Sequence, residues 1–270
     1  MPGRWTDLDR PPLSAARLRS VLRDSRVWRD IRLVDETGST NADVRSAAET
    51  GEGEGLVVAA ERQVGGRGRL DRQWESPSRA GVLMSLLLRP TVASARLPLL
   101  PLLTGLAVVE AVRAVAELPA AVKWPNDVLV DGRKLGGILV ERTADAAVVV
   151  GIGVNVSLRP DELPVPTATS VQIAGGVPDR ESLVKEVLRA FERRYVVFTE
   201  SAGEPGSILP AYREVCDTIG RQVEVQLPGG ESARGMAVTV DDSGMLVVRG
   251  ADGVDRTWSA GDVVHVRAEG

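Results

Sequence analysis

An Asp-Gly pair between two apolar runs is the feature that most constrains the fold of this chain. Asp131 and Gly132 separate a run that ends in DVLV from the run RKLGGILVER. An Asp-Gly pair in this setting favours the tight turn of a β-hairpin, because its residues accept the positive φ angles that such turns require. Residues 120–142 are therefore expected to form a hairpin within an antiparallel sheet.

The remaining periodicity adds strands and helices around this hairpin. Apolar stretches of strand length lie at residues 31–37, 55–63, 81–90 and 146–157. Helical spacing of apolar positions, or a long apolar run, marks residues 13–30, 39–51, 98–117 and 181–200. The sequence thus predicts an α+β domain with a mixed sheet and flanking helices over residues 1–215.

The sequence pattern of the chain changes after about residue 215. Residues 216–270 contain four or five short strand-like runs joined by Gly-containing turns. This pattern is typical of a small antiparallel barrel of the SH3-like type. We expect a second, C-terminal β domain over residues 216–270.

Composition and charge exclude several classes of protein. The net charge of -4 comes without a basic block, so bulk electrostatics give no reason to expect nucleic-acid binding. The single cysteine, Cys216, excludes an internal disulfide and is expected to be a buried structural thiol in a reducing compartment. The N-terminus has no apolar signal core, and no apolar run reaches the ~18 residues that span a bilayer. We expect a cytoplasmic protein that does not enter membranes.

A loop rich in glycine and arginine, GGRGR at residues 65–69, is the first candidate site. Its glycines permit sharp turns and can present backbone N–H groups to an anion. Arg67 and Arg69 add permanent charge and paired donors suited to phosphate or carboxylate. Arg72 and Trp74 follow, and an indole is a good surface for stacking. A plain surface loop would have the same composition, so the loop alone does not decide between these interpretations.

The segment KWPND, residues 123–127, is the second candidate. Pro125 interrupts strand pairing and leaves short polar side chains at a fixed kink. The amide of Asn126 can donate and accept together, as reading a base edge requires. Asp127 could hold Mg²⁺, which favours one or two carboxylates with phosphate oxygens. An ordinary Pro-Asn turn is the alternative.

Lysine is scarce in this chain, and two of its three lysines, Lys123 and Lys134, lie within twelve residues of each other. Lys134 precedes Gly136 and Gly137, two adjacent glycines that mark a bulge or a place where a ligand approaches the backbone. The run GIGVN, residues 151–155, repeats small residues in a buried strand followed by an amide. Lys134 could neutralise a carboxylate or a developing phosphate charge.

The segment Ser39-Thr40-Asn41 offers hydroxyl and amide groups at the start of a predicted helix. These groups could bind the polar head of a neutral ligand. Helix capping is an equally good interpretation, and both roles can hold together.

Taken in order, these segments resemble the catalytic domain of bacterial biotin protein ligases. The resemblance rests on GSTN (38–41), ERQVGGRGR (61–69), W-x-S-P (74–77), KWPNDV (123–128), KLGGILVE (134–141) and GIGVN (151–155). It runs from about residue 35 to residue 157. It implies a class II synthetase-like catalytic domain with a mixed sheet, completed by a small SH3-like domain.

The resemblance also implies roles for individual residues. It places the following residues at biotin: Ser39, Thr40, Asn41, Gln63, Gly66, Arg67, Gly68, Lys134, Gly136 and Gly137. It places another group at ATP or the adenylate: Arg69, Arg72, Trp74, Asn126 and Asn155. Lys134, Arg67 and Arg69 are the expected catalytic residues, and Asp127 is the expected Mg²⁺ ligand.

The activity implied is the ATP-dependent formation of biotinyl-5'-AMP and the transfer of biotin to a lysine of a carrier protein. The implied partner is the biotin carboxyl carrier domain of acyl-CoA and pyruvate carboxylases, and the enzyme is expected to be a monomer or a weak homodimer. Both nucleophiles belong to the substrates, so the reaction needs no Ser, Cys or His of the protein. Catalysis by positioning and by stabilising charge on phosphate agrees with the residues present.

Two departures from the family pattern stand out. Many relatives have glycine where this chain has Asp71 and arginine where it has Leu70. In addition, only 38 residues precede Ser39, whereas a winged helix-turn-helix needs on the order of 60. We therefore expect no repressor function and no sequence-specific DNA binding.

Two other functions compete with this interpretation. A lipoate-protein ligase would share the architecture and the use of a carrier lysine, but GRGR together with KWPND argues against it. A non-enzymatic regulator could bind biotin or nucleic acid through the β domain. The acidic net charge argues against nucleic acid.

Overall fold

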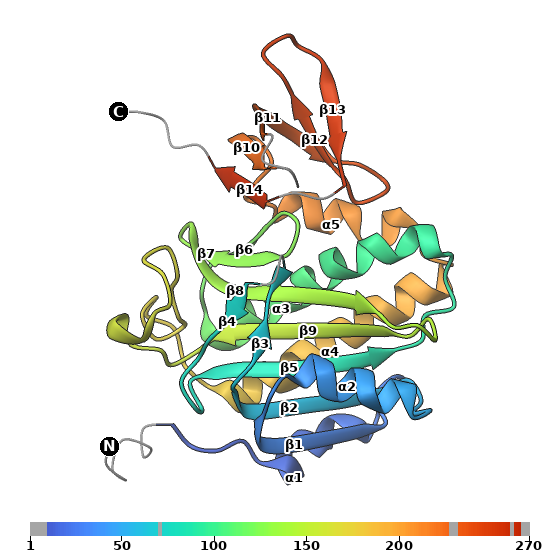
Figure 1. The fold of residues 1–270 in the computed structure, drawn as a ribbon, viewed down its shortest axis with the longest axis vertical. Coiled ribbons are helices and arrows are strands. Elements are labelled where there is room, and N and C mark those ends of the chain that lie inside the picture. The colour runs from blue at the N-terminus through green and yellow to red at the C-terminus, as the bar shows by residue number, and fades with distance from the viewer. Residues whose placement is uncertain (1–9, 70–71, 227–231, 260–261, 266–270) are drawn as a thin grey trace.

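The computed structural model describes residues 10–69, 72–226, 232–259 and 262–265. Leu70 and Asp71, the two departures in the Gly-Arg loop, lie outside the described residues. The elements form a large domain built on a central sheet and a small β domain beyond it (Figure 1).

A seven-stranded sheet is the frame of the large domain. Its order is β1-β2-β5-β9-β8-β7-β6, with β1 and β2 parallel and every other neighbouring pair antiparallel. The strands are β1 (Asp30–Thr37), β2 (Leu56–Gln63), β5 (Gly81–Leu88), β6 (Ala120–Lys123), β7 (Asp127–Val130), β8 (Arg133–Arg142) and β9 (Val148–Asn155). A two-stranded ribbon, β3 (Gly66–Arg67) with β4 (Gln73–Trp74), lies beside this sheet.

Helices cover both faces of the sheet (Figure 1). The α-helices are α1 (Ala15–Leu18), α2 (Thr40–Glu49), α3 (Leu100–Ala116), α4 (Arg180–Glu200) and α5 (Leu209–Glu214). Short 3-10 helices are η1 (Arg19–Leu22), η3 (Ser94–Leu99), η4 (Pro160–Glu162) and η5 (Pro205–Ser207). Helix α2 packs on one face of the sheet, and α3 and α4 pack together on the other.

The alternation of side chains along a strand explains how the same strand contributes to packing on both faces of the sheet. In β9, Val148, Val150, Ile152 and Val154 belong to the large core under α3 and α4. Val149 belongs to the smaller apolar cluster under α2. Successive side chains of a strand point to opposite faces, so Gly151, Gly153 and Asn155 continue the α2 face beyond that cluster. The pattern GIGVN thus lets other side chains approach the strand on the α2 face, where Asn41 and Trp74 pack against Gly151 and Gly153.

Helix α3 is the buried helix that the apolar run predicted. The expectation that no apolar run reaches spanning length was wrong, because Ser94–Ala116 is long and apolar enough to cross a membrane by length and composition. However, 72% of its apolar 18-residue window is buried inside the protein, as in a core helix. Its apolar surface is covered by α4 and by the sheet.

Two expectations from the sequence were wrong in detail. The predicted helix over residues 13–30 stops at Leu22, because the Ser25 hydroxyl accepts hydrogen bonds from the backbone N–H groups of Val27 and Trp28. Such side-chain acceptors compete with helical hydrogen bonds. The predicted hairpin over 120–142 is a three-stranded meander, since the turn at residues 124–126 divides its first arm into β6 and β7.

The small domain is a five-stranded antiparallel sheet of order β13-β12-β11-β10-β14. Its strands are β10 (Gln222–Gln226), β11 (Ser232–Val240), β12 (Leu246–Arg249), β13 (Asp255–Trp258) and β14 (Asp262–His265). This arrangement agrees with the small SH3-like β domain predicted from the Gly-rich turns.

Trp124 joins the two domains. Its side chain is 2% exposed, and its indole Nε1 donates to the carbonyl oxygen of Gly244 at 3.0 Å. Its backbone N–H donates to Thr218 Oγ1 at 3.0 Å, in the segment that leads into the small domain. The KWPND turn is therefore attached directly to the small domain.

The substitution Trp124→Phe tests this attachment. It keeps an aromatic ring but removes the buried donor to Gly244, which leaves a carbonyl oxygen without its partner. We expect the free energy of unfolding to fall by about 1–3 kcal/mol, as measured by urea denaturation. Trp258→Phe serves as the matched control, because the indole Nε1 of Trp258 has no hydrogen-bond partner among the described residues. A Trp124→Phe protein as stable as the parent would contradict the importance of this hydrogen bond.

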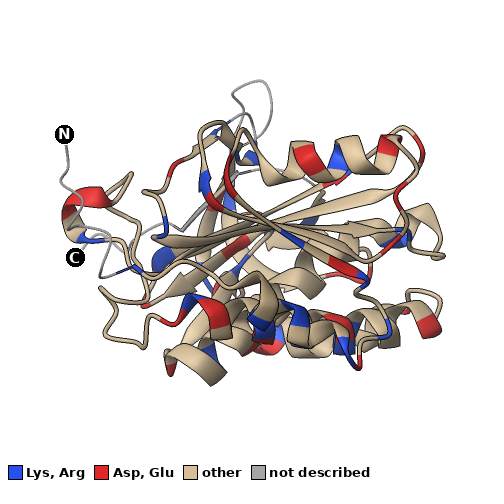
Figure 2. Cartoon of the chain, turned by 90° about the horizontal axis from the view of Figure 1, so that it is seen from below, with Lys and Arg blue, Asp and Glu red and all other residues tan. Residues whose placement is uncertain are grey.

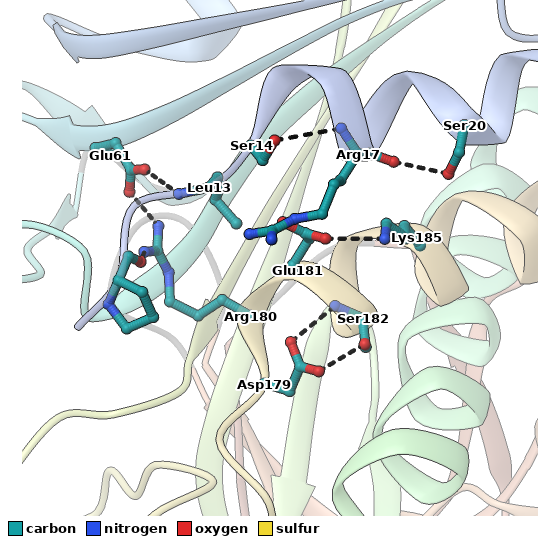
Figure 3. A network of polar contacts seen from close by, with 11 residues as sticks. Leu13, Ser14, Arg17, Ser20, Glu61, Asp179, Arg180, Glu181, Ser182 and Lys185 are labelled. Atoms are coloured by element: carbon teal, nitrogen blue, oxygen red, sulfur yellow. Dashed lines mark hydrogen bonds and ion pairs between the residues drawn. The ribbon is translucent and has the colours of Figure 1, made fainter. Parts of the chain in front are cut away.

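A buried ion pair ties the start of the chain to the large domain. Arg180, 6% exposed, donates to Glu61 Oε2 at 2.5 Å, and the Glu61 side chain is 3% exposed (Figure 3). Glu61 also accepts the backbone N–H of Leu13 at 2.6 Å, and Arg180 donates to the carbonyl oxygens of Gly81 and Pro11. Burial lowers the pKa of Arg180 from its ordinary value, while Glu61 opposes that shift.

Replacing one residue of this ion pair leaves the charge of the other residue buried without its counter-charge. We expect Arg180→Met to lower the free energy of unfolding by about 3–5 kcal/mol. The double variant Arg180→Met/Glu61→Leu should lose less than the two single variants together, because it leaves no buried charge. Urea denaturation of the three variants measures these differences. A loss below about 1 kcal/mol for Arg180→Met would show that the pair is dispensable.

Candidate active site

One large cavity brings the candidate residues together. Its volume is about 1030 Å³, and the β3–β4 ribbon, the β6–β7 turn and the small domain all contribute to its walls. The sequence-predicted residues in its walls are Ser39, Thr40, Asn41, Gln63, Arg67, Gly68, Arg69, Arg72, Trp74, Asn126, Asp127, Lys134, Gly137 and Asn155. Residues from separate stretches of the large domain therefore meet at one place.

Gly66 and Gly136 are the two predicted residues that lie behind the walls. A Cβ on Gly66 would lie 2.5 Å from the carbonyl oxygen of Trp74, within the β3–β4 ribbon. A Cβ on Gly136 would lie 2.7 Å from the carbonyl oxygen of Gly153, on the neighbouring strand. Both glycines allow close packing of the backbone that supports the cavity.

One end of the cavity is lined by hydroxyl and amide groups. Gln63 Oε1 accepts hydrogen bonds from the backbone N–H of Thr40 at 2.8 Å and from its hydroxyl at 2.9 Å. Ser39 occupies the N-cap position of α2 without a side-chain capping hydrogen bond. The Ser-Thr-Asn segment therefore begins the helix, as expected. Thr40 is in addition hydrogen-bonded to Gln63 at the end of β2.

A chain of hydrogen bonds continues from Thr40 into the protein. Its hydroxyl lies 2.7 Å from that of Ser85, which donates to Asn41 Oδ1 at 2.6 Å. Asn41 Nδ2 donates to Glu141 Oε2 at 2.7 Å. Glu141 is also ion-paired with Arg45 at 2.5 Å.

Ser85 and Glu141 were missed in the sequence. Ser85 interrupts the otherwise apolar run GVLMSLLL, and a polar residue fully buried in a strand needs hydrogen-bond partners. A single serine within this apolar run therefore indicates, from the sequence alone, a buried side chain that is hydrogen-bonded. Glu141 lies on the cavity face of β8, but the sequence does not reveal its partner Asn41, which is 100 residues away.

The other end of the cavity carries charge. Arg69 Nη1 donates to Asn126 Oδ1 at 3.1 Å, and Asn126 Nδ2 donates to the carbonyl oxygen of Ile138 at 2.9 Å. Lys134 Nζ lies 2.7 Å from Asp127 Oδ1. The Gly-Arg loop, the KWPND turn and β8 are thus linked by their own polar side chains.

Trp74 lies against the glycine positions of the sheet. A Cβ on Gly153 would lie 2.6 Å from Trp74 Cε2, so any side chain there would displace the indole. On the neighbouring strand, Gly137 approaches the same ring, with a Cβ distance of 3.4 Å. The indole Nε1 is buried without a hydrogen-bond partner among the described residues. The indole therefore forms an apolar wall with one polar atom unused by the described protein groups.

Asn155 ends the β9 strand beside this wall. Its side chain is 3% exposed, and Nδ2 donates to the carbonyl oxygen of Thr169 at 3.0 Å. The small domain and the segment before it add Asp217, Arg221 and Val263 to the walls, which the sequence analysis did not anticipate. Nothing in the local sequence around these residues indicates a contact with the cavity.

Cys216 lies between the two domains and is buried, as expected of a structural thiol. Burial raises the pKa of this thiol above its usual value. A buried neutral thiol is a poor nucleophile. The chemistry of the cavity therefore rests on arginine, lysine, amide and hydroxyl groups.

These groups suit a ligand with a polar head, an apolar middle and an anionic region. Thr40 and Gln63 offer hydrogen bonds at one end, and the Trp74 indole with the glycine strand forms an apolar wall. Arg69 and Lys134 supply positive charge at the other end, where phosphate or carboxylate is stabilised.

Comparisons with known proteins identify the family of this chain. Residues 34–157 match the biotin/lipoate A/B protein ligase family, and residues 218–266 match the biotin protein ligase C-terminal domain. The biotin–[acetyl-CoA-carboxylase] ligase of Mycobacterium tuberculosis is 40% identical, over 97% of this chain and 100% of that protein. The bifunctional ligase/repressor of Bacillus subtilis is 33% identical, over 92% of this chain and 78% of that protein.

Solved structures agree with the sequence relatives. The biotin protein ligase of Aquifex aeolicus in complex with biotin and ATP has a TM-score of 0.76 and 29% identity, with 89% of this chain and 100% of that chain covered. The Leishmania major enzyme in complex with biotinyl-5-AMP has a TM-score of 0.62 and 28% identity, covering 85% and 98%. The chain therefore belongs to the biotin/lipoate A/B protein ligase family and, within it, to the biotin protein ligases.

Proposed function

We propose that the cavity holds biotin with its ring at Thr40 and Gln63 and its carboxylate toward Lys134. The adenylate then lies near Trp74, Asn126 and Asn155. The observation that supports this placement is the convergence of separate sequence motifs on one cavity. The relatives that contain biotin and ATP, or biotinyl-5-AMP, support the same ligand pair.

The activity of a biotin protein ligase consists of two transfers. An oxygen of the biotin carboxylate attacks the α-phosphorus of ATP, and the bond to pyrophosphate breaks to give biotinyl-5'-AMP. The amine of a carrier lysine then attacks the acyl carbon and expels AMP. An amide forms, and the amine loses a proton. Substrate groups are the nucleophiles in both transfers, so the protein contributes position and charge.

We assign the stabilisation of phosphate charge during catalysis to three cationic side chains. Lys134 is held by Asp127 at the charged end of the cavity, and Arg69 is held by Asn126. Arg67 lies in the same wall. Fixed positive groups of this kind stabilise charge that accumulates on the phosphate during transfer, because they need no reorientation at that moment.

Magnesium is the metal that ATP chemistry requires, and the donor set of the cavity fits it. The described residues contain no group of three or more His, Cys, Asp or Glu that could form a metal cage. Mg²⁺ with a nucleotide needs only one or two carboxylates, since phosphates and water complete its shell. Asp127 in the cavity wall would supply the carboxylate. The ion would neutralise part of the phosphate charge.

The proposed partner is a biotin carboxyl carrier domain of an acyl-CoA or pyruvate carboxylase. The name of the relative from Mycobacterium tuberculosis supports the acetyl-CoA carboxylase carrier. Residues of both charge signs are interspersed over the helices and loops (Figure 2). That distribution supports our proposal that the enzyme does not bind DNA. We also propose a cytoplasmic enzyme that is a monomer or a weak homodimer.

Replacing Lys134 tests the assignment directly. We expect Lys134→Ala to lower the rate of carrier biotinylation by about a hundredfold or more, because one charge-stabilising donor is lost. Intact mass of a carrier domain, incubated with the protein, biotin and Mg·ATP, measures the addition of a biotinyl group. Lys185→Ala is the matched control, because Lys185 is ion-paired with Glu181 on α4 and is not among the cavity residues.

A parallel reaction offers lipoate in place of biotin. We expect no addition to a lipoyl carrier domain, while the biotin reaction proceeds. Lipoyl transfer at a comparable rate would contradict the proposed specificity. An unchanged biotinylation rate in Lys134→Ala would contradict the role of that lysine.

A further inference from the structure

The chain forms a loop beyond β9, and we refer to its residues 157–170 as the wall loop. The chain leaves the sheet after Asn155 and returns beside the same strand end. There the N–H of Val171 donates to the carbonyl oxygen of Asn155 at 3.1 Å, and the next residue pairs in the same way with Val156. The base of the wall loop is therefore fixed by the sheet.

The second half of the wall loop lies along the cavity. The N–H of Lys134 donates to the carbonyl oxygen of Thr167 at 2.9 Å, and its own carbonyl oxygen accepts the N–H of Thr169 at 2.8 Å. The amide of Asn155 donates to the carbonyl oxygen of Thr169 at 3.0 Å. This half of the loop is thus held by β8 and β9 themselves.

The tip of the wall loop, residues 162–165, lies at a side opening of the cavity. Pro164 and Val165 contribute to the cavity walls. Glu162 and Pro164 also line a second hollow of about 410 Å³, whose opposite side is the β3–β4 ribbon with Trp74. Trp74 and Pro164 line both spaces, so the hollow adjoins the cavity. The position of the tip relative to the ribbon therefore decides how far this side is open.

Arg10 binds the wall loop from outside it. Its guanidinium donates to both carboxylate oxygens of Glu162, with Nη1 3.1 Å from Oε1, and Nη2 also donates to the carbonyl oxygen of Ser157 at 2.8 Å. Partial burial acts to raise the pKa of Glu162, but hydrogen bonds from Arg10 and from the N–H of Arg159 lower it below its ordinary value. The carboxylate is thus ionised at neutral pH. One planar cation therefore ties together the two ends of the turn that leads to the tip.

Arg10 is itself held through its neighbours in the chain. Glu61 accepts the N–H of Leu13 at 2.6 Å (Figure 3), and Arg180 donates to the carbonyl oxygen of Pro11 at 3.2 Å. The side chains of Glu61 and Arg180 are almost fully buried. The buried ion pair thus fixes the segment from which Arg10 reaches the wall loop.

We propose that Arg10 is a positioning residue that holds the tip of the wall loop at the side opening and so keeps water from biotinyl-5'-AMP between the two transfers. This inference rests on the proposed function. The contacts proposed for the ligand at Thr40, Lys134 and Asn126 lie outside the tip, so they persist when the tip moves. The tip therefore excludes water rather than binding the adenylate.

The reaction that the tip would prevent is hydrolysis of the mixed anhydride. The oxygen of a water molecule forms a bond to the acyl carbon, and the bond from that carbon to the phosphate oxygen of AMP breaks. Biotin and AMP result, and the protons of the water are released. Each such event consumes one ATP without biotinylating a carrier, which is the kind of side reaction that a closed site suppresses.

The variant Arg10→Met tests the inference, because it removes the donors but keeps an apolar stem. The full chain is incubated with biotin and Mg·ATP without a carrier, and AMP is measured over time by chromatography. We expect Arg10→Met to release AMP about tenfold faster than the parent, the effect on the open form of losing one charge-assisted hydrogen bond. General damage to the site would slow formation of the adenylate and would therefore lower the release of AMP.

Rapid filtration distinguishes entry of water from loss of the ligand. The filtrate of Arg10→Met should contain AMP, whereas intact biotinyl-5'-AMP in its place would overturn the proposal. At a saturating carrier domain the lysine amine competes with water. The rate of carrier biotinylation by Arg10→Met should then stay within about twofold of the parent rate, because the groups that position the reactants are unchanged.

Two further variants separate the tip from general stability. Arg17→Met is the matched control, since Arg17 lies in the same N-terminal segment but pairs with Glu181. Its release of AMP should stay within about twofold of the parent. Val165→Gly removes a side chain of the tip and leaves Arg10 in place, so it should raise the release of AMP about threefold or more. It provides the test if Arg10→Met does not fold. A folded Arg10→Met protein, or a Val165→Gly protein, that releases AMP as slowly as the parent would overturn the proposal.

The outcomes also distinguish this inference from the proposed function. If the parent protein forms no biotinyl-5'-AMP and biotinylates no carrier domain, the proposed function itself is wrong. If the parent is active and the release of AMP is unchanged in Arg10→Met, only the role of Arg10 is wrong.

Discussion

The close approach of side chains to the backbone of β9 is the constraint on which the site depends. Gly151 makes room for the amide of Asn41, and Gly153 makes room for the indole of Trp74. Both lie on the α2 face of the sheet, while the residues between and beside them are buried in the core on the other face. One strand thus serves as a packed core element and as the floor of the cavity.

Much of the fold could be read from the sequence, because it depends on local patterns. The Asp131-Gly132 turn, the alternation of β9 and the buried helix α3 each follow from residues close in sequence. The N-terminal helix was overestimated, since the hydrogen bonds of Ser25 that end the helical spacing are a matter of conformation rather than of apolar period. The division of the hairpin at residues 124–126 follows from Pro125, which interrupts strand pairing, although the hairpin prediction did not apply that local signal. The hydrogen bond that Trp124 forms with Gly244 in the small domain has no local signal in the sequence.

The site was predictable to the extent that its residues lie in compact motifs. Thr40, Gln63, Arg69, Asn126 and Lys134 line one cavity. What the sequence could not reveal is how these residues hold one another. The bond between Arg69 and Asn126, for example, joins positions that are 57 residues apart. Arg221 enters the wall only because the two domains are docked, and no local pattern encodes that arrangement.

The buried pair of Glu61 and Arg180 has a consequence for the order of events during synthesis. The two residues are 119 positions apart, so the carboxylate leaves the ribosome long before its cation does. At about 5–20 residues per second, that delay amounts to several seconds or more. In this interval β2 carries a charged group at a position that will later be sealed from water. The nascent large domain therefore cannot reach its final packing until α4 has been made. Until then its early strands remain in an incompletely packed intermediate.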